Sequence, residues 1–353
     1  MYCCTPISRI TLVTLTYMKK FLFIAAIALS LSNCTTKESE KEILVESFPI
    51  EETLPSLRID LEDAEYLTDM MGIAGDFLVF RTSRTNYFLQ VYDKEFNLVG
   101  KLLNQGQGPN ELPEIDWYDQ WCGLPSNPQI QVVCTPLKRL SSLEINPFNG
   151  LTTICDIPAS EDLEPRMMFA TTDTTILGVS LSLYNGSAIF RYNTENKTAL
   201  LCESPFEFAD GPTKFYTTQQ GIAYNPERKE ICSAYYSFPS MVIYDYNFNV
   251  RRIINIGEKV DTKTLTFDAN YPRLTPPQYY KNFIICLLIN NDATESKLLV
   301  FDTNGEPRAS YAVGQAYSFV INEQKQQILT LKYDNEADLV YLDCYPLPEL
   351  LKH

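Results

Sequence analysis

The sequence predicts an all-β fold, a six-bladed β-propeller of about 50 residues per blade. Three observations support this prediction. A hairpin-like segment recurs six times at nearly even spacing along the 353 residues. The composition favours strands, with 22 Tyr and 19 Phe against 14 Gly. The last copy of the segment lacks an outer strand, and a spare strand-like segment precedes the first copy.

Each copy of the repeat contains a polar corner at the end of an apolar run. The corners are Asp93, Asn146, Asn193, Asp245, Asp302 and Asp343, at steps of 53, 47, 52, 57 and 41 residues. Asp and Asn accept backbone hydrogen bonds in tight turns, and a Gly or Asn that follows provides a positive φ. The period is typical of propeller blades, whereas the alternative fold, a pair of β-sandwiches, would not explain it.

Two strand-like runs lead into each corner, and they alternate between apolar and polar residues. In order along the chain, the pairs are "DFLVFRTS" and "YFLQVYD", "IQVVCTP" and "LSSLEIN", "TILGVSLSLYN" and "GSAIFRYN", "EICSAYYSF" and "SMVIYDY", "NFIICLLINN" and "KLLVFDT", and "QQILTLKYDNE" and "DLVYLDCY". The spare segment "SLRIDLED" (56–63) would complete the last blade and close the ring. Closure removes the exposed sheet edges that an open propeller would leave.

The N-terminal segment has the features of a secretory signal. Lys19 and Lys20 precede an apolar run over 21–31, which is too short to span a membrane as a helix. The run ends in Leu31-Ser32-Asn33-Cys34, which resembles the lipobox of bacterial lipoproteins, with Asn33 where Gly, Ala or Ser is usual. The resemblance implies lipid attachment at Cys34; an ordinary cleaved signal and an uncleaved anchor are the alternatives.

These features divide the chain into four parts. We expect residues 1–17 to be a mis-assigned start upstream of Met18, 18–33 to be the lipoprotein signal peptide, 34–50 to be a flexible tether and 51–348 to be the propeller. Thr35 and Thr36 provide no acidic retention signal of the kind known for inner-membrane lipoproteins. The expected location is therefore the cell envelope, lipid-anchored at the outer membrane.

Several classes of function are disfavoured by the residues that the chain lacks. The only histidine is His353, which removes Ser-His-Asp and Cys-His catalysis and histidine-rich metal sites. Ten cysteines contain no C-x-x-C pair, so a zinc site is not predicted, and several lie in apolar runs as small core residues. One or two disulfides remain an option in an exported protein. A net charge of −15 makes nucleic acid an unexpected partner.

With this repeat and signal, the chain resembles the TolB-like six-bladed propeller lipoproteins of Gram-negative bacteria. The most specific shared feature is the stretch "GQGPNEL", in which Gly106, Gly108, Pro109 and Glu111 match the G-x-G-P-x-E pattern of that family. Most members are uncharacterised, so the resemblance implies an architecture and an envelope location more than an activity.

The loop "GQGPNELPEIDWYDQW" is the candidate binding site, because loops between blades lie around the central channel. Its candidate residues are Gly106, Gly108, Pro109, Asn110, Glu111, Asp116, Trp117, Tyr118 and Trp121. Aromatic rings beside carboxylates suit a sugar, since rings stack on C–H surfaces and carboxylates accept hydroxyl hydrogen bonds. The alternative is structural: the glycines shape a turn, and the aromatic residues pack between blades.

The sequence therefore favours a lipid-anchored binding or scaffold module for a glycan or an envelope protein, with no catalytic residues and no cofactor. The alternative is a histidine-independent enzyme in the central channel. It would be either a glycosidase-like hydrolase that uses Glu111, Asp116 or Asp119, or a calcium-dependent lactonase. Calcium is the one cofactor left open.

Overall fold

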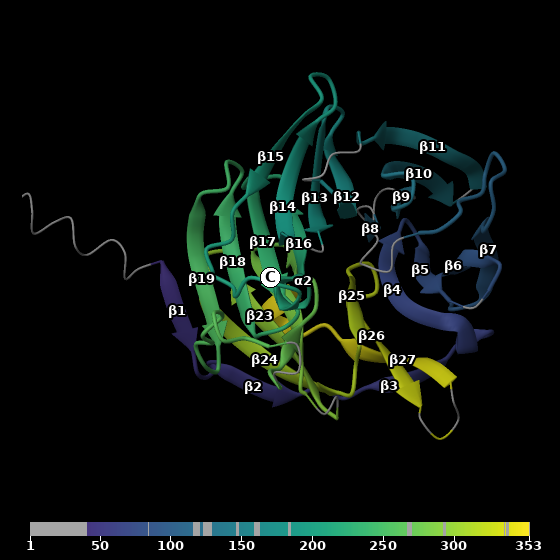
Figure 1. Ribbon diagram of the computed structural model, residues 1–353. Coiled ribbons are helices and arrows are strands. Elements are labelled where there is room, and N and C mark those ends of the chain that lie inside the picture. The colour runs from purple at the N-terminus through teal and green to yellow at the C-terminus, as the bar shows by residue number, and fades with distance from the viewer. Residues whose placement is uncertain are drawn as a thin grey trace, which may run out of the picture. The chain divides into compact units, whose positions relative to one another are not determined.

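The computed structural model describes residues 41–83, 85–115, 121–122, 129–145, 148–158, 163–182, 185–266, 270–291, 294–334, 336 and 339–352. The chain divides into two units, Met1–Ile43 and Leu44–His353. The second unit contains six sheets arranged as a six-bladed β-propeller, which confirms the predicted fold class (Figure 1). The predicted signal peptide and Cys34 lie outside the described residues. No described helix is long and apolar enough to cross a membrane.

Each blade is built from strands that follow one another in sequence, from the channel to the rim (Figure 1). Blade 1 contains β4 (Leu67–Ala74), β5 (Phe77–Thr82), β6 (Tyr87–Tyr92) and β7 (Leu98–Asn104). Blade 2 contains β8 (Trp121–Cys122), β9 (Gln129–Cys134), β10 (Arg139–Ile145) and β11 (Phe148–Asp156). Blade 3 contains β12 (Pro165–Thr172), β13 (Thr175–Ser182), β14 (Gly186–Asn193) and β15 (Thr198–Cys202).

Blades 4 to 6 follow the same order. Blade 4 contains β16 (Gln220–Asn225), β17 (Glu230–Tyr235), β18 (Ser240–Asp245) and β19 (Val250–Ile256). Blade 5 contains β20 (Arg273–Leu274), β21 (Gln278–Tyr280), β22 (Phe283–Ile289), β23 (Ser296–Asp302) and β24 (Pro307–Gly314). Blade 6 contains β25 (Ser318–Asn322), β26 (Gln327–Asp334) and β27 (Leu339–Pro346). The helices among the described residues are η1 (Ala64–Tyr66), before blade 1, α2 (Thr213–Thr217), before blade 4, and α3 (Glu349–Lys352), after blade 6.

The ring is closed by an N-terminal strand, as the sequence predicts. Strand β3 (Leu57–Asp60) pairs antiparallel with β27 and provides the fourth strand of blade 6, with Ile59 opposite Leu342. Two further strands extend other blades at the rim. Strand β2 (Ile50–Thr53) runs parallel to β24 of blade 5, and β1 (Glu42–Val45) is the neighbour of β19 of blade 4. The segment assigned to the tether (34–50) thus includes a strand.

The hydrophobic core lies between neighbouring blades rather than inside any one of them. Between blades 3 and 4, for example, Val179 and Ile189 belong to the same buried cluster as Phe238 and Val242. The described cysteines Cys134, Cys155, Cys202, Cys232, Cys286 and Cys344 are all free and buried, as expected of small core residues. Burial raises the pKa of the Cys202 thiol to about 12, so this cysteine stays a neutral thiol.

The predicted corners at Asp93, Asp245 and Asp302 share one hydrogen-bonding pattern. In each, one carboxylate oxygen accepts the backbone N–H groups two and four residues later, at 2.8–3.0 Å. The turn requires a positive φ three residues after the aspartate, and Phe96, Phe248 and Gly305 adopt it with φ of 67°, 65° and 87°. The same local chemistry therefore folds the outer hairpin of three blades.

A basic side chain from the preceding blade holds each of these three corners. Arg191 of blade 3 donates from Nη1 to the carbonyl of Tyr246, and Lys325 of blade 6 donates from Nζ to the carbonyl of Lys94. Arg252 of blade 4 donates from Nε to the carbonyl of Asn304 at 3.1 Å. The corner end of the propeller thus uses its polar groups to join one blade to the next.

The sixth predicted corner is wrong, because Asp343 lies within β27 rather than at a turn. It is opposite Thr330 in β26 and Arg58 in β3. Its carboxylate instead forms an ion pair with the ammonium of Lys332, with an Nζ–Oδ2 distance of 2.5 Å. Blade 6 needs no corner after its third strand, because its fourth strand comes from the other end of the chain.

We expect Asp302→Ala to lower the free energy of unfolding by about 1–3 kcal/mol, because the substitution removes the acceptor of two backbone donors and of Arg308. Burial alone would raise the pKa of Asp302. Hydrogen bonds from Arg308, Glu306 and Asn304 outweigh this effect and lower it. The contribution is therefore present above about pH 4 and is lost as the pH falls through the folded-state pKa.

Urea unfolding at pH 7 and pH 3 measures the effect of Asp302→Ala. Asp210→Asn is the control, because the Asp210 side chain is 99% exposed, and we expect no change from it. Equal stability losses in the two variants would contradict the role given to this corner.

Candidate functional site

The described part of the predicted loop forms a turn around its own glutamate. One carboxylate oxygen of Glu111 accepts the N–H of Gly108 at 2.9 Å, and the N–H of Glu111 donates to the carbonyl of Gly108 at 3.2 Å. A Cβ atom on Gly106 would lie 2.0 Å from Glu111 Oε2, so any larger residue would displace the Glu111 carboxylate from this position. These contacts give Gly106, Gly108 and Glu111 a role in shaping the loop.

The remaining described residues of the loop anchor it to the propeller. The Asn110 side chain accepts the N–H of Leu151 in β11 at 3.2 Å, and Pro109 is exposed. Leu112 and Ile115 are buried between blades 1 and 2. Asp116, Trp117, Tyr118 and Asp119 lie outside the described residues. Trp121 begins β8 opposite Gln131, and its side chain is outside the described part.

A small pocket lies between blades 3 and 4, at residues that the sequence analysis does not single out. The space between its walls, counted together with open solvent, is about 270 Å³. The lining comes from the inner and second strands of blade 3, the start of β14, and both ends of the β16–β17 hairpin. The lining residues are Arg166, Met167, Val179, Leu181, Ser187, Gln219, Gln220 and Tyr236.

Buried polar side chains hold the floor of the pocket. Ser233 donates from its hydroxyl to Gln220 Oε1, and Gln220 Nε2 donates to Ser187 Oγ at 3.3 Å. The Ser187 N–H donates to Thr218 Oγ1 at 2.7 Å, and that hydroxyl donates to the carbonyl of Lys214 in α2 at 2.6 Å. This chain of hydrogen bonds fixes the orientation of the Gln220 amide.

The opposite wall of the pocket is held by close backbone packing. The N–H of Tyr236 donates to the carbonyl of Gln219 at 3.0 Å. A Cβ atom on Gly221 would lie 2.5 Å from the Tyr236 hydroxyl and 2.8 Å from Pro276, so glycine is needed for this approach. Of the described residues that line the pocket, Arg166 alone carries a charge. The pocket thus offers one cation, two amides and two hydroxyls beside an apolar wall.

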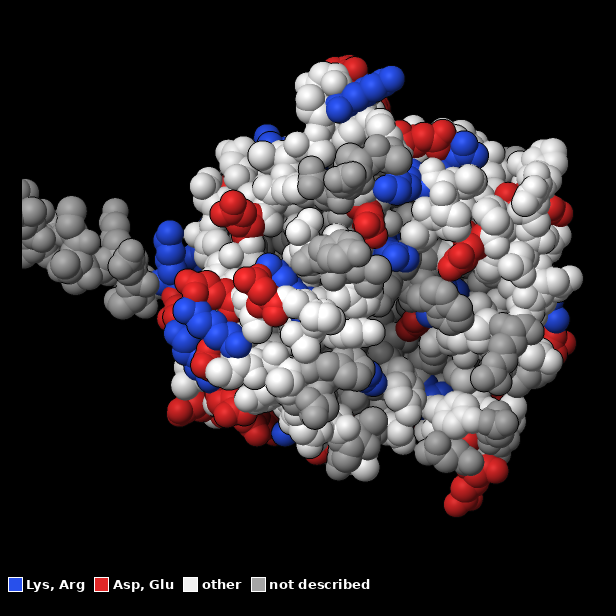
Figure 2. Space-filling model, viewed as in Figure 1, with Lys and Arg blue, Asp and Glu red and all other residues white. Residues whose placement is uncertain are grey.

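The pocket and the predicted loop open at the same end of the propeller, opposite the aspartate corners. Strand β14 begins at Gly186 beside the pocket and ends at the Asn193 corner. Strand β7 begins after the Asp93 corner and ends at Asn104, directly before the loop. Figure 2 shows that acidic and basic side chains intermingle on the face in view, with no large patch of one sign. Among the described residues, no three His, Cys, Asp or Glu side chains are placed to hold a metal ion.

The sequence contains no motif for this pocket, because its residues come from five separate segments of two blades. The one available signal is local: Gln219 and Gln220 precede Gly221 at the start of an inner strand, where polar amides and a glycine break the apolar pattern.

Comparisons with known proteins identify the fold. No protein-family model and no curated protein matches the sequence. A member of the DUF4221 family from Bacteroides vulgatus ATCC 8482 is similar over 83% of this chain and 96% of its own, with 12% identity and a TM-score of 0.57. A protein from Bacteroides fragilis NCTC 9343, named as exported, is similar over 86% and 98%, with 11% identity and a TM-score of 0.53. A luciferin-regenerating enzyme is similar over 83% and 95%, with 9% identity and a TM-score of 0.51.

At these identities the likeness is one of fold. Each of the three structures is covered almost completely, so the propeller accounts for nearly the whole of those chains. Membership of the TolB-like family is not established by these matches. The chain is a six-bladed β-propeller similar in fold to Bacteroides proteins.

Proposed function

We propose that this chain is a lipid-anchored envelope module that binds an acidic glycan at the pocket between blades 3 and 4. The observation that carries the proposal is the position of Arg166 beside the oriented Gln220 amide and the Ser187 hydroxyl, at the same end as the loop 105–121. A guanidinium pairs well with a carboxylate, and amides and hydroxyls exchange hydrogen bonds with sugar hydroxyls.

The size and walls of the pocket support a terminal sugar rather than a large ligand. Because the 270 Å³ includes open solvent, the pocket could hold only one end of a ligand, such as the terminal group of a glycan. Met167, Val179 and Leu181 provide an apolar wall for the C–H face of a sugar ring. For the rest of a glycan, the candidate stacking partners are the aromatic residues that the sequence predicts, Trp117, Tyr118 and Trp121.

The N-terminal segment supports the envelope location. The short apolar run followed by Cys34 supports an exported lipoprotein, and a protein of the same fold is named as exported. We place the anchor at Cys34 and the protein at the outer membrane, as the resemblance to TolB-like lipoproteins implies. A scaffold role toward a second envelope protein is the alternative outcome of the test below.

We expect glucuronate-terminated oligosaccharides to bind the chain at least ten-fold more tightly than their carboxyl-reduced counterparts, because a charge-assisted hydrogen bond contributes about 1.5–3 kcal/mol. Arg166→Gln should abolish this preference, and Trp117→Ala should weaken both ligands. Isothermal titration calorimetry measures the affinities. Arg308→Gln is the control, because Arg308 pairs with Asp302 at the opposite end of the propeller.

An unchanged preference in Arg166→Gln would refute the pocket as the site. Absence of glycan binding, together with capture of one envelope protein that Arg166→Gln fails to capture, would replace the glycan by a protein partner at the same pocket.

A further inference from the structure

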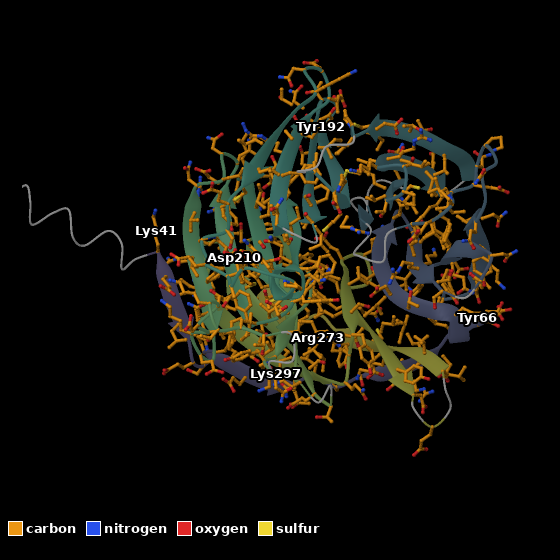
Figure 3. The ribbon with its side chains drawn as sticks, viewed as in Figure 1. Lys41, Tyr66, Tyr192, Asp210, Arg273 and Lys297 are labelled. Carbon is orange, nitrogen blue, oxygen red and sulfur yellow. The ribbon has the colours of Figure 1, made fainter. Side chains whose placement is uncertain are left out.

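The outer strand of blade 3 is an exposed apolar edge. Strand β15 is the last strand of its sheet, and its sequence TALLC contains no charged residue. Leu200 is 47% exposed and Leu201 41%, although their side chains point to opposite faces of the strand. The hairpin formed by β14 and β15 extends outward from the ring (Figure 1). Tyr192, in β14, marks this hairpin in Figure 3.

The outer strands of the other blades are either covered by a further strand or carry charged and polar side chains. Strands β1 and β2 cover the edges of β19 and β24, and β3 completes the sheet beyond β27. The edge strand β7 carries Lys101, whose ammonium forms an ion pair with Asp63 at 2.6 Å. The described part of β11 exposes Thr152, Thr153 and Asp156. Charged and polar side chains on an edge strand oppose pairing with another chain. Strand β15 has no charged residue, and nothing covers Leu200 or Leu201 among the described residues.

We propose that β15 pairs antiparallel with β15 of a second copy of this chain, about a two-fold axis at Leu200. Within the strand, this register pairs Thr198 with Cys202, Ala199 with Leu201, and Leu200 with itself. The exposed Lys197, in the turn before the strand with a φ of 56°, and the exposed Glu203, directly after the strand, would then form two ion pairs across the axis. Such a self-complementary patch is what a two-fold interface requires.

Charge also selects this register over its neighbours on the same strand. Moving the axis to Ala199 would shift Lys197 from Glu203 to Leu201, which removes both ion pairs. Moving it to Leu201 would place Lys197 opposite Pro205, which removes both ion pairs. The register centred at Leu200 therefore keeps the charges complementary and buries the leucines.

The interface is short, so the dimer is weak in dilute solution. A strand of five residues buries far less than the roughly 1,000 Å² expected of a stable interface. This dimer is independent of the proposed glycan site, since the pocket lies at the other end of β14. A covalent trap is the suitable measurement for so weak a contact.

We expect the full chain with Leu200→Cys to form a disulfide-linked dimer under mild oxidation, because residue 200 faces its own copy. Directly opposite residues in antiparallel strands have Cα atoms about 4.5–5.5 Å apart, which is within disulfide range. Leu201→Cys is the matched control. It is similarly exposed but faces Ala199, so it should give several-fold less dimer. The unsubstituted chain gives the background from the native cysteines.

The second part of the test exchanges the charges of Lys197 and Glu203. Sedimentation at high concentration should show less dimer for Lys197→Glu and for Glu203→Lys, and recovery in the double variant. Equal cross-linking of Leu200→Cys and Leu201→Cys, or no dimer from Leu200→Cys, would overturn the proposal. Failure of the double variant to recover would overturn the register.

Discussion

A chain that begins at Glu62 is expected to lose the cooperative unfolding transition that a chain beginning at Pro55 retains. Both lack β1 and β2, but only the longer chain keeps β3. Without β3, the edge of β27 is left without its described partner and blade 6 is one strand short. Because each core cluster lies between two blades, an incomplete blade weakens the clusters on both of its sides.

The residues of β3 account for a large effect. Ile59 packs against the cluster between blades 6 and 1. Arg58 donates from Nη1 to Asp334 at 2.9 Å, and its guanidinium lies 4.1 Å from the ring centroid of Tyr341. Ile59 is only partly buried, so it contributes less than the roughly 1.5–3 kcal/mol of a fully buried side chain, and each ladder hydrogen bond adds about 1 kcal/mol. The sum is comparable with the roughly 5–15 kcal/mol that stabilises a whole domain.

Thermal unfolding followed by near-ultraviolet circular dichroism measures both chains. As a rescue, the segment 56–63 is attached to the C-terminus of the chain that begins at Glu62, through a flexible linker. Restoration of the transition would assign the effect to β3. If the two shortened chains unfold at the same temperature, ring closure by β3 is not what stabilises the propeller.

The fold could be predicted from sequence because the chemistry of its corners is local. At Asp93, Asp245 and Asp302, the carboxylate binds N–H groups no more than four residues away, so each corner is visible in a short segment. Asp343 was misread because the same residue type there binds Lys332, on the neighbouring strand. The sequence around a single strand residue does not show which residue of the neighbouring strand it will contact.

The rim strands β1 and β2 and the pocket could not be predicted for the same reason. Strand β2 is mostly exposed, and its partner β24 lies near the other end of the chain. The pocket joins Arg166 to Gln220 and Tyr236, which no spacing rule connects. The G-x-G-P-x-E stretch was visible, yet its described contacts are with its own backbone and with β11. A short motif is therefore more readily recognised than explained.

The buried ion pair between Lys332 and Asp343 gives the second large expected effect. The Nζ–Oδ2 distance is 2.5 Å, and each side chain is only 9% exposed. Tyr345 donates from its hydroxyl to the carbonyl of Val313 at 2.6 Å and to Asp343 Oδ2 at 3.2 Å. Removing one charge leaves the other buried without its partner, so we expect Lys332→Met or Asp343→Leu alone to lower the free energy of unfolding by about 3–5 kcal/mol.

The double variant Lys332→Met with Asp343→Leu separates this penalty from the net contribution of the ion pair to the free energy of unfolding. We expect it to lie within about 1–2 kcal/mol of the natural chain, or above it, because apolar residues of similar size need no desolvated charges. Urea unfolding of all four chains at pH 7 gives the coupling energy of the cycle. Additive losses in the two single variants would show that the charges do not depend on one another.

The pH dependence provides an independent check of the same pair. Burial alone lowers the pKa of Lys332, but hydrogen bonds with Asp343 and Tyr345 outweigh it, and the net shift is upward. Because the folded-state pKa exceeds the unfolded value of about 10.4, the stabilisation is complete below that pH and is lost as the pH rises through the folded value. Above pH 10, the natural chain should therefore lose more stability than the double variant, since the buried tyrosines that do not contact the pair contribute equally in both chains; Tyr345, which contacts both residues of the pair, is the exception. If the free energies of unfolding of the two chains run parallel between pH 8 and 11, the charge of the Lys332 ammonium does not contribute to stability.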